Sequence, residues 1–251
     1  SDLRSALQLP DQGRQFYQLI RSGWHEFAIV DFDHPLRNLF HVGTLIPCVS
    51  GRSRFVPDLT LFLNGLPLAM IEVKTNMRRN GIQAERDRMS RRLAQEAFRP
   101  FLQAAQLWVF STDQPDNPDL LRPTEGIYYA AAMADPFPIY AFHLPARPQR
   151  ISGHLRREDV RQILAEFKAQ ELLDNPVFRG RLSPFSPTHQ MLSGLFTPIK
   201  WLWMLRYGIL GEGIEDASSR KDAAAALFSS VIRPMLFAGG DSESFFTKAA
   251  T

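Results

Sequence analysis

Two carboxylates and one ammonium stand out in a stretch that is otherwise mostly apolar, FVPDLTLFLNGLPLAMIEVKT. Asp58 follows a proline, and Glu72 and Lys74 lie two residues apart near the end of the stretch. Two carboxylates can hold one or two Mg²⁺ ions, and a neighbouring lysine can activate a water or stabilise a phosphoryl oxyanion. This combination predicts phosphodiester hydrolysis, with Asp58, Glu72 and the backbone carbonyl of Val73 as metal ligands.

The same residues also have a purely structural interpretation. Asp58 would open a strand in a Pro-Asp turn, and Glu72 and Lys74 would form an ion pair on an edge strand. Short motifs of this kind often occur by chance. The flanking sequence PLAMI favours the catalytic interpretation, because so apolar a strand is expected to be buried, and buried charges need partners or a metal.

The register of the two strands decides whether the three side chains can meet. Asn64-Gly65 is a strong signal for a two-residue hairpin turn. In such a hairpin, Asp58 would lie opposite Ile71, on the face away from the other two charges. A three-residue loop or one β-bulge would instead place Asp58 opposite Met70 and on the shared face. A functional trio therefore predicts an odd loop or a bulge.

The elements around this hairpin alternate between strands and helices. Helices are predicted at 12–21 and 82–105 from apolar spacing and helix-forming composition. Runs rich in β-branched and aromatic residues predict strands at 26–32, 39–49, 52–56, 106–112, 125–133 and 138–144. The alternation predicts an α/β fold.

The character of the sequence changes after Pro148. A helix is predicted at 154–173, and Ser186-Pro187 and Thr197-Pro198 each have the N-cap and first-turn residues of a helix start. An alanine-rich helix is expected at 218–230. Three parts are predicted: a catalytic domain at 1–148, a helical segment at 149–210 and a tail at 211–251.

The hairpin sequence PDLTLFLNGLPLAMIEVK resembles the PD-(D/E)xK nuclease motif of the restriction (R) subunit of type I restriction–modification systems. IVDFDHPLRNLFHV, QLWVFSTD and SPTHQMLSGLFTPIKWLWMLRYGI are similar to other segments of that family, so the resemblance covers about residues 16–210. It implies a restriction-endonuclease-like mixed sheet flanked by helices and followed by a small helical segment. It also implies a type I site-specific deoxyribonuclease that cuts double-stranded DNA, with Asp58, Glu72 and Lys74 as catalytic residues.

Cofactors and partners follow from the same resemblance. It implies Mg²⁺ at the nuclease site, and specificity and methyltransferase subunits as partners. The family's ATP-driven motor is expected to be absent from this chain, because no G-x-x-x-x-G-K-[ST] motif occurs in it. A single cysteine, no signal-peptide pattern and no apolar run long enough for a bilayer predict a cytoplasmic protein without a membrane partner.

Basic residues that follow the E-x-K motif are candidates for contacts with DNA phosphates. An alternative is a solvated helix face with local acidic partners. Many family members carry a Q-x-x-x-Y element on this helix, but here neither Gln83 nor Gln95 has a tyrosine four residues later. The predicted DNA-binding residues are Arg78, Arg79, Arg88, Arg91, Arg92 and, as a substitute for the missing element, Gln95.

Two alternatives to an active type I nuclease remain open. One is a catalytically silent DNA-binding or assembly module of the same fold, which the missing Q-x-x-x-Y element supports. The other is a repair or resolvase nuclease of the same superfamily. The segment SPTHQMLSGLFTPIKWLWMLRYGI argues against it, because it is similar to the segment that joins the nuclease to the motor in the R subunit family. Separately, DFDH at 31–34 could be taken for a metal cluster, but the following Pro35 favours a turn that ends a strand.

Overall fold

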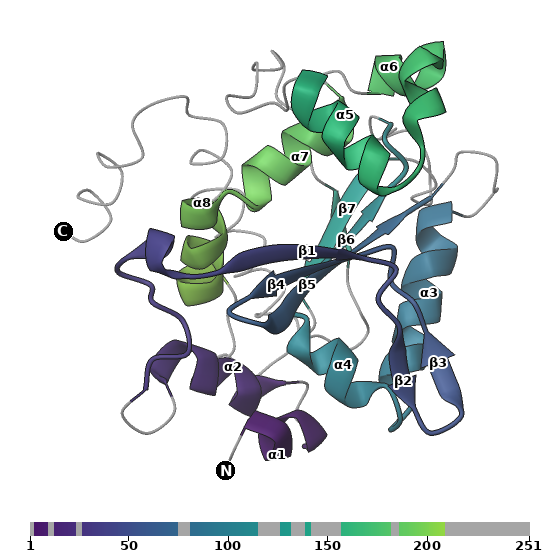
Figure 1. Ribbon diagram of the computed structural model, residues 1–251. Coiled ribbons are helices and arrows are strands. Elements are labelled where there is room, and N and C mark those ends of the chain that lie inside the picture. Colours follow the sequence, from purple (N-terminus) through teal and green to yellow (C-terminus); the bar gives the residue numbers. More distant parts are fainter. Residues whose placement is uncertain are drawn as a thin grey trace.

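The computed structural model describes residues 3–9, 13–23, 27–74, 81–114, 126–131, 139–141, 157–181 and 186–208. Within these residues the chain forms a six-stranded sheet in the order β1-β4-β5-β6-β7-β8, with helices against both faces (Figure 1). Only β5 and β6 run parallel, and the other neighbouring strands are antiparallel. The predicted class, a mixed α/β sheet flanked by helices with a helical C-terminal part, is confirmed.

The strands of this sheet are β1 (Phe40–Thr44), β4 (Leu59–Leu63), β5 (Leu66–Val73), β6 (Leu107–Ser111), β7 (Ile127–Ala131) and β8 (Tyr140–Ala141). A separate hairpin is formed by β2 (Cys48–Ser50) and β3 (Ser53–Phe55). Each strand lies within a run that the sequence predicted, except that the run at 39–49 divides between β1 and β2, and β2 extends one residue beyond it. The parallel pair requires a crossover, and two helices between β5 and β6 provide it.

The helices are α1 (Leu3–Gln8), α2 (Arg14–Ser22), α3 (Gly81–Leu93), α4 (Arg99–Ala104), α5 (Arg157–Glu166), α6 (Pro176–Arg181), α7 (Pro187–Leu195) and α8 (Pro198–Trp203). Three shorter helical turns are η1 (Pro35–Arg37), η2 (Gln170–Asp174) and η3 (Met204–Gly208). The single helix expected at 82–105 is two helices, because the chain turns after Leu93 and Pro100 occupies the first turn of α4. No described helix is both long and apolar enough to cross a membrane.

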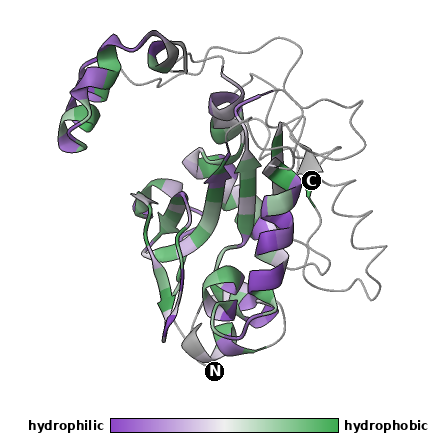
Figure 2. Cartoon of the chain, turned by 90° about the vertical axis from the view of Figure 1, so that its right-hand side faces the viewer, coloured by the Kyte–Doolittle hydropathy of each residue, from purple (hydrophilic) through white to green (hydrophobic). Residues whose placement is uncertain are grey.

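Strand β6 shows how the sheet is buried on both faces. All five of its residues are buried, as expected for a strand covered on both sides. Leu107 and Val109 join a core cluster with α2, α7 and α8, whereas Trp108 and Phe110 join a second cluster with α3 and α4. Figure 2 shows hydrophobic residues along the strands at the centre of the molecule. Glu72 has the same parity on β5 as Met70, so its side chain lies on the face that α3 covers.

The strand expected at 26–32 is not formed at 27–32, and this prediction is wrong for the described part of the run. Side-chain hydrogen bonds explain the difference. Asp31 N donates to Asn38 Oδ1 (2.9 Å), and Asn38 Nδ2 donates to the carbonyl of Asp31 (2.7 Å). Asp31 Oδ1 accepts from the backbone N–H of His34 (2.8 Å), which closes a turn. These bonds compete with strand pairing and support the turn interpretation of DFDH.

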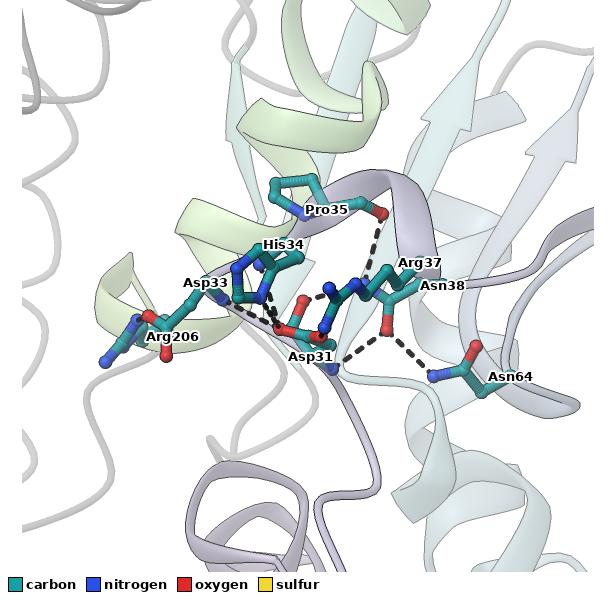
Figure 3. A network of polar contacts seen from close by, with 8 residues as sticks. All are labelled: Asp31, Asp33, His34, Pro35, Arg37, Asn38, Asn64 and Arg206. Atoms are coloured by element: carbon teal, nitrogen blue, oxygen red, sulfur yellow. Dashed lines mark hydrogen bonds and ion pairs between the residues drawn. The ribbon is translucent and has the colours of Figure 1, made fainter.

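This turn also holds the tip of the β4–β5 hairpin (Figure 3). Asn64 Oδ1 accepts from Leu39 N (2.8 Å), and Asn64 Nδ2 donates to Asn38 Oδ1 (2.9 Å) and to the carbonyl of Ile29 (2.8 Å). Arg206 of η3 reaches the same turn through an ion pair with Asp33 at 2.7 Å. These contacts attach the hairpin tip to the chain segment that precedes β1.

Helices α7 and α8 pack into the same core as the sheet, rather than apart from it. Met191, Leu195 and Trp201 are buried against residues of α2 and β5. The proposed boundary near residue 148 and the tail at 211–251, with its expected helix at 218–230, lie outside the described residues and stay predictions.

Candidate active site

The hairpin that carries the three charged residues combines a tight turn with a bulge. Leu63 pairs with Leu66, so Asn64-Gly65 is a two-residue turn, and both turn residues have positive φ (51° and 81°). The register shifts between Leu61 and Phe62, because one extra residue lies in β5. The predicted bulge is therefore confirmed, and the alternative three-residue loop is wrong.

The bulge changes which residue faces Asp58. Leu59 pairs with Ile71, and continuing this register by one position places Asp58 opposite Glu72. The expected partner, Met70, was wrong because the extra residue lies in the second strand and not in the turn. Asp58 nevertheless lies on the same face as Glu72 and Lys74, as expected, since opposed residues share a face of the sheet.

Backbone contacts fix the ends of the strands that carry the site. Asp58 Oδ2 accepts the backbone N–H of Val73 at 2.7 Å. The N–H of Lys74 donates to the carbonyl of Ser111 at 2.8 Å, which extends the parallel β5–β6 pairing to the site. The three candidates are thus held by main-chain contacts from two neighbouring strands, and not by side chains alone.

The ammonium of Lys74 lies at the centre of a group of carboxylates. Its Nζ is 3.0 Å from Glu72 Oε2 and 3.5 Å from Asp58 Oδ2. It is also 3.3 Å from Glu85 Oε2. The structure therefore brings the three predicted residues together and adds a fourth ionisable side chain, Glu85.

Glu85 was missed as a site residue, because in the sequence it looked like a local partner for the arginines of α3. Its side chain is completely buried, and its Oε2 lies 2.7 Å from Nη2 of Arg88 as well as 3.3 Å from Lys74. Both contacts are ion pairs without hydrogen-bond geometry. A signal existed: Ile82, Glu85 and Met89 are spaced as one face of a helix, so the glutamate interrupts an apolar stripe.

Burial controls the electrostatics of this group. Burial raises the pKa of Glu72 to about 7, with Glu85 and Asp58 adding to the rise and Lys74 opposing it. Burial alone would lower the pKa of Lys74, but Glu72, Glu85 and Asp58 outweigh it, so this pKa is raised. Both shifts favour the protonated form of the group, mainly because of burial for Glu72 and because of the three neighbouring carboxylates for Lys74.

One oxygen of Glu72 has no partner among the residues that the structure describes. Its Oε1 is buried and accepts no hydrogen bond there. Such an atom is costly to bury. No three His, Cys, Asp or Glu side chains of the described ranges are arranged as a metal site, so a cation here would need ligands beyond carboxylates. Mg²⁺ ordinarily keeps several waters and uses only one or two carboxylates, so the donors Asp58 and Glu72 fit its chemistry.

The predicted DNA-binding residues are placed differently from one another. Arg78 and Arg79 lie outside the described residues. The side chain of Arg88 is 41% exposed and reaches the site through Glu85. Arg92 lies over the ring of Phe55 (4.8 Å), and burial lowers its pKa while Glu85 and Glu72 oppose that shift. The remaining two, Arg91 and Gln95, are exposed, on the last turn of α3 and in the turn before α4.

The end of β6 connects the site to α7. The hydroxyl of Thr188, in the first turn of α7, donates to Asp113 Oδ1 at 2.6 Å and lies 3.0 Å from Ser111 Oγ. The backbone N–H of Thr188 donates to the same carboxylate at 3.1 Å. Ser111 is also the residue whose carbonyl accepts from Lys74. The C-terminal helices are therefore attached to the strand next to the charged group.

Comparison with known proteins gives one match. Residues 1–115 match the family model for the type I restriction enzyme R protein N terminus, a range that includes Asp58, Glu72, Lys74 and Glu85. No curated protein and no solved structure matches significantly. This match covers a little less than half of the chain, and it supports an N-terminal fragment of a type I restriction enzyme R protein.

Proposed function

We propose that this chain is the Mg²⁺-dependent endonuclease domain of a type I restriction enzyme R subunit, which hydrolyses phosphodiester bonds of double-stranded DNA. The observation that carries the proposal is the convergence of Asp58 and Glu72 on the ammonium of Lys74 at the ends of paired strands. The match of residues 1–115 to the R protein family supports the restriction system as its setting.

Asp58 and Glu72 would hold the metal, and the backbone carbonyl of Val73 is the proposed third protein ligand. The partnerless oxygen of Glu72 and its raised pKa both support a cation as the missing partner. A bound Mg²⁺ would polarise the phosphate and make its bound water more acidic.

Lys74 is the proposed second catalytic group. Its side chain is only 17% exposed, and three carboxylates favour its protonated form. A protonated lysine beside a scissile phosphate stabilises the negative charge that develops on the phosphoryl oxygens. The proposed role of Lys74 is therefore to stabilise this charge and to orient the attacking water.

The same proposal assigns the partners of the domain. Double-stranded DNA would lie against α3, where Arg88, Arg91, Arg92 and Gln95 are proposed contacts together with Arg78 and Arg79. Specificity and methyltransferase subunits would direct the domain to its target, and ATP-driven translocation would come from a motor domain.

A silent DNA-binding or assembly module is the second candidate. The missing Q-x-x-x-Y element supports it. Both candidates place DNA on the same surface, so cleavage distinguishes them.

Cleavage of supercoiled plasmid in Mg²⁺ tests the proposal, for the chain alone and for the chain assembled with its restriction partners. We expect Asp58→Ala, Glu72→Ala and Lys74→Ala each to lower the rate by at least about 100-fold. Asp33→Asn, which alters an exposed carboxylate on the turn before η1, serves as the control and should cleave normally. Mg²⁺-independent cleavage, or full activity in folded alanine variants, contradicts the proposal. A folded, DNA-binding protein that is inactive in both settings supports the silent module.

A further inference from the structure

Glu85 is a buried carboxylate that the proposed chemistry does not use. Its side chain is completely buried in the middle of α3, between Ile82 and Met89 of the apolar stripe. Burial of a carboxylate is unfavourable unless charged partners compensate. Among the described residues, Glu85 forms ion pairs with Lys74 and Arg88, both through the same oxygen, Oε2.

The three carboxylates around Lys74 differ in what else they have to do. Asp58 and Glu72 are the proposed ligands of the metal, and oxygens that bind a cation interact less with a lysine. Glu85 approaches from α3, the helix that covers this face of the sheet. It is thus the carboxylate that remains available to Lys74 when the other two bind a metal.

Arg88 is the second group that Glu85 holds. Its guanidinium is 2.7 Å from Glu85, yet its side chain is 41% exposed. A guanidinium has five N–H donors in a rigid plane. One contact to Glu85 therefore leaves donors on the exposed guanidinium for a phosphate oxygen.

We propose that Glu85 is a positioning residue that holds Lys74 toward the scissile phosphate and Arg88 toward a DNA phosphate. This inference rests on the proposed nuclease function for its Lys74 part only. The Arg88 part concerns DNA binding and does not depend on cleavage. Glu85 lies on the helix after E-x-K, the helix that carries the Q-x-x-x-Y element in many family members and lacks it here.

Glu85→Gln tests the proposal, because glutamine keeps the size of the side chain and removes its charge. Two quantities are measured: kcat for plasmid cleavage at saturating DNA, and Kd for a fluorescent duplex in EDTA, where no cleavage occurs. We expect Glu85→Gln to lower kcat by roughly 10- to 100-fold and to raise Kd several-fold. Arg88→Gln should raise Kd to a similar extent and should lower kcat less than Glu85→Gln does, since Arg88 does not contact Lys74. Glu96→Gln, an exposed carboxylate in the turn after α3, is the matched control and should change neither.

Three outcomes overturn the proposal. The first is an unchanged kcat and Kd in folded Glu85→Gln, which would show that Glu85 has only a structural role. The second is a loss of activity that only parallels a loss of folded protein, followed by circular dichroism at the assay temperature. The third is an equal kcat for Glu85→Gln and Arg88→Gln, which would remove the link to Lys74. If the wild type does not cleave at all, the proposed function fails instead, and Kd alone still decides the Arg88 part.

Discussion

Asp58 is bound to the end of the neighbouring strand by the backbone N–H of Val73, which donates to its Oδ2 at 2.7 Å. The bond joins the residue before β4 to the residue between Glu72 and Lys74. It can form because the bulge in β5 shifts the register by one residue. Without that extra residue, Asp58 would face the opposite side of the sheet. The spacing of the charged group is therefore a property of the backbone of one hairpin.

The turn of this hairpin depends on Asn64 in two ways. Its φ is positive (51°), and its side chain makes three hydrogen bonds that hold the preceding chain. Asn64→Gly keeps the backbone conformation but loses the bonds, and should lower the free energy of unfolding by about 1 kcal/mol. Asn64→Ala should cost about 1 kcal/mol more, because alanine is strained at positive φ. Urea denaturation of both variants measures the two contributions. An alanine variant as stable as the glycine variant would contradict the backbone part.

Thr188 predicts a second effect on stability. Its hydroxyl donates to Asp113 at 2.6 Å and attaches α7 to the end of β6. Thr188→Val keeps the shape of the side chain and leaves Asp113 with one donor fewer, so we expect a loss of about 1–2 kcal/mol in urea denaturation. The matched control is Thr197→Val, because Thr197 precedes α8 without making a side-chain cap hydrogen bond. Equal losses in the two variants would show that the Thr188–Asp113 contact contributes nothing specific.

The buried Glu72 predicts how stability depends on pH in the metal-free protein. Burial raises its pKa from 4.5 to about 7 on folding, so the folded state binds this proton more tightly than the unfolded state. The contribution is fully present below the unfolded pKa and is lost as the pH rises through the folded pKa. Between about pH 4.5 and pH 7, Glu72 should lower the free energy of unfolding by on the order of 3 kcal/mol.

Urea denaturation in EDTA at pH 5 and pH 7.5 checks this prediction. The wild type should lose more stability than Glu72→Gln between these values, because glutamine has no proton to lose. Parallel behaviour of the two proteins would mean that the Glu72 carboxyl is not shifted upward by burial.

The sequence predicted the class of the fold, because strand and helix patterns act over short ranges. It also related the shared face of Asp58, Glu72 and Lys74 to a bulge or an odd loop, since strand periodicity is two. The sequence could not decide between a β-bulge and an odd loop. Pro67 lies beside the bulge and has no N–H for the ladder, which favours a bulge there over regular pairing.

The elements that the sequence missed depend on contacts between distant residues. No local pattern shows that Asn38 and Asn64 share a hydrogen bond, although that network replaces the expected strand at 27–32. The contact of Glu85 with Lys74 depends on the position of α3 beside the end of β5. Its spacing from Ile82 and Met89 was a signal in the sequence, but only the fold shows its partners.

We propose that Asp58 and Glu72 hold a divalent cation beside Lys74. A crystal soaked in Mn²⁺ and measured at the manganese absorption edge tests this directly. In the wild type we expect an anomalous peak for a Mn²⁺ ion that both carboxylates bind. In crystals of Glu72→Gln we expect no peak at this position. A well-ordered site with no ion between Asp58 and Glu72, at a Mn²⁺ concentration that supports cleavage in solution, would contradict the claim.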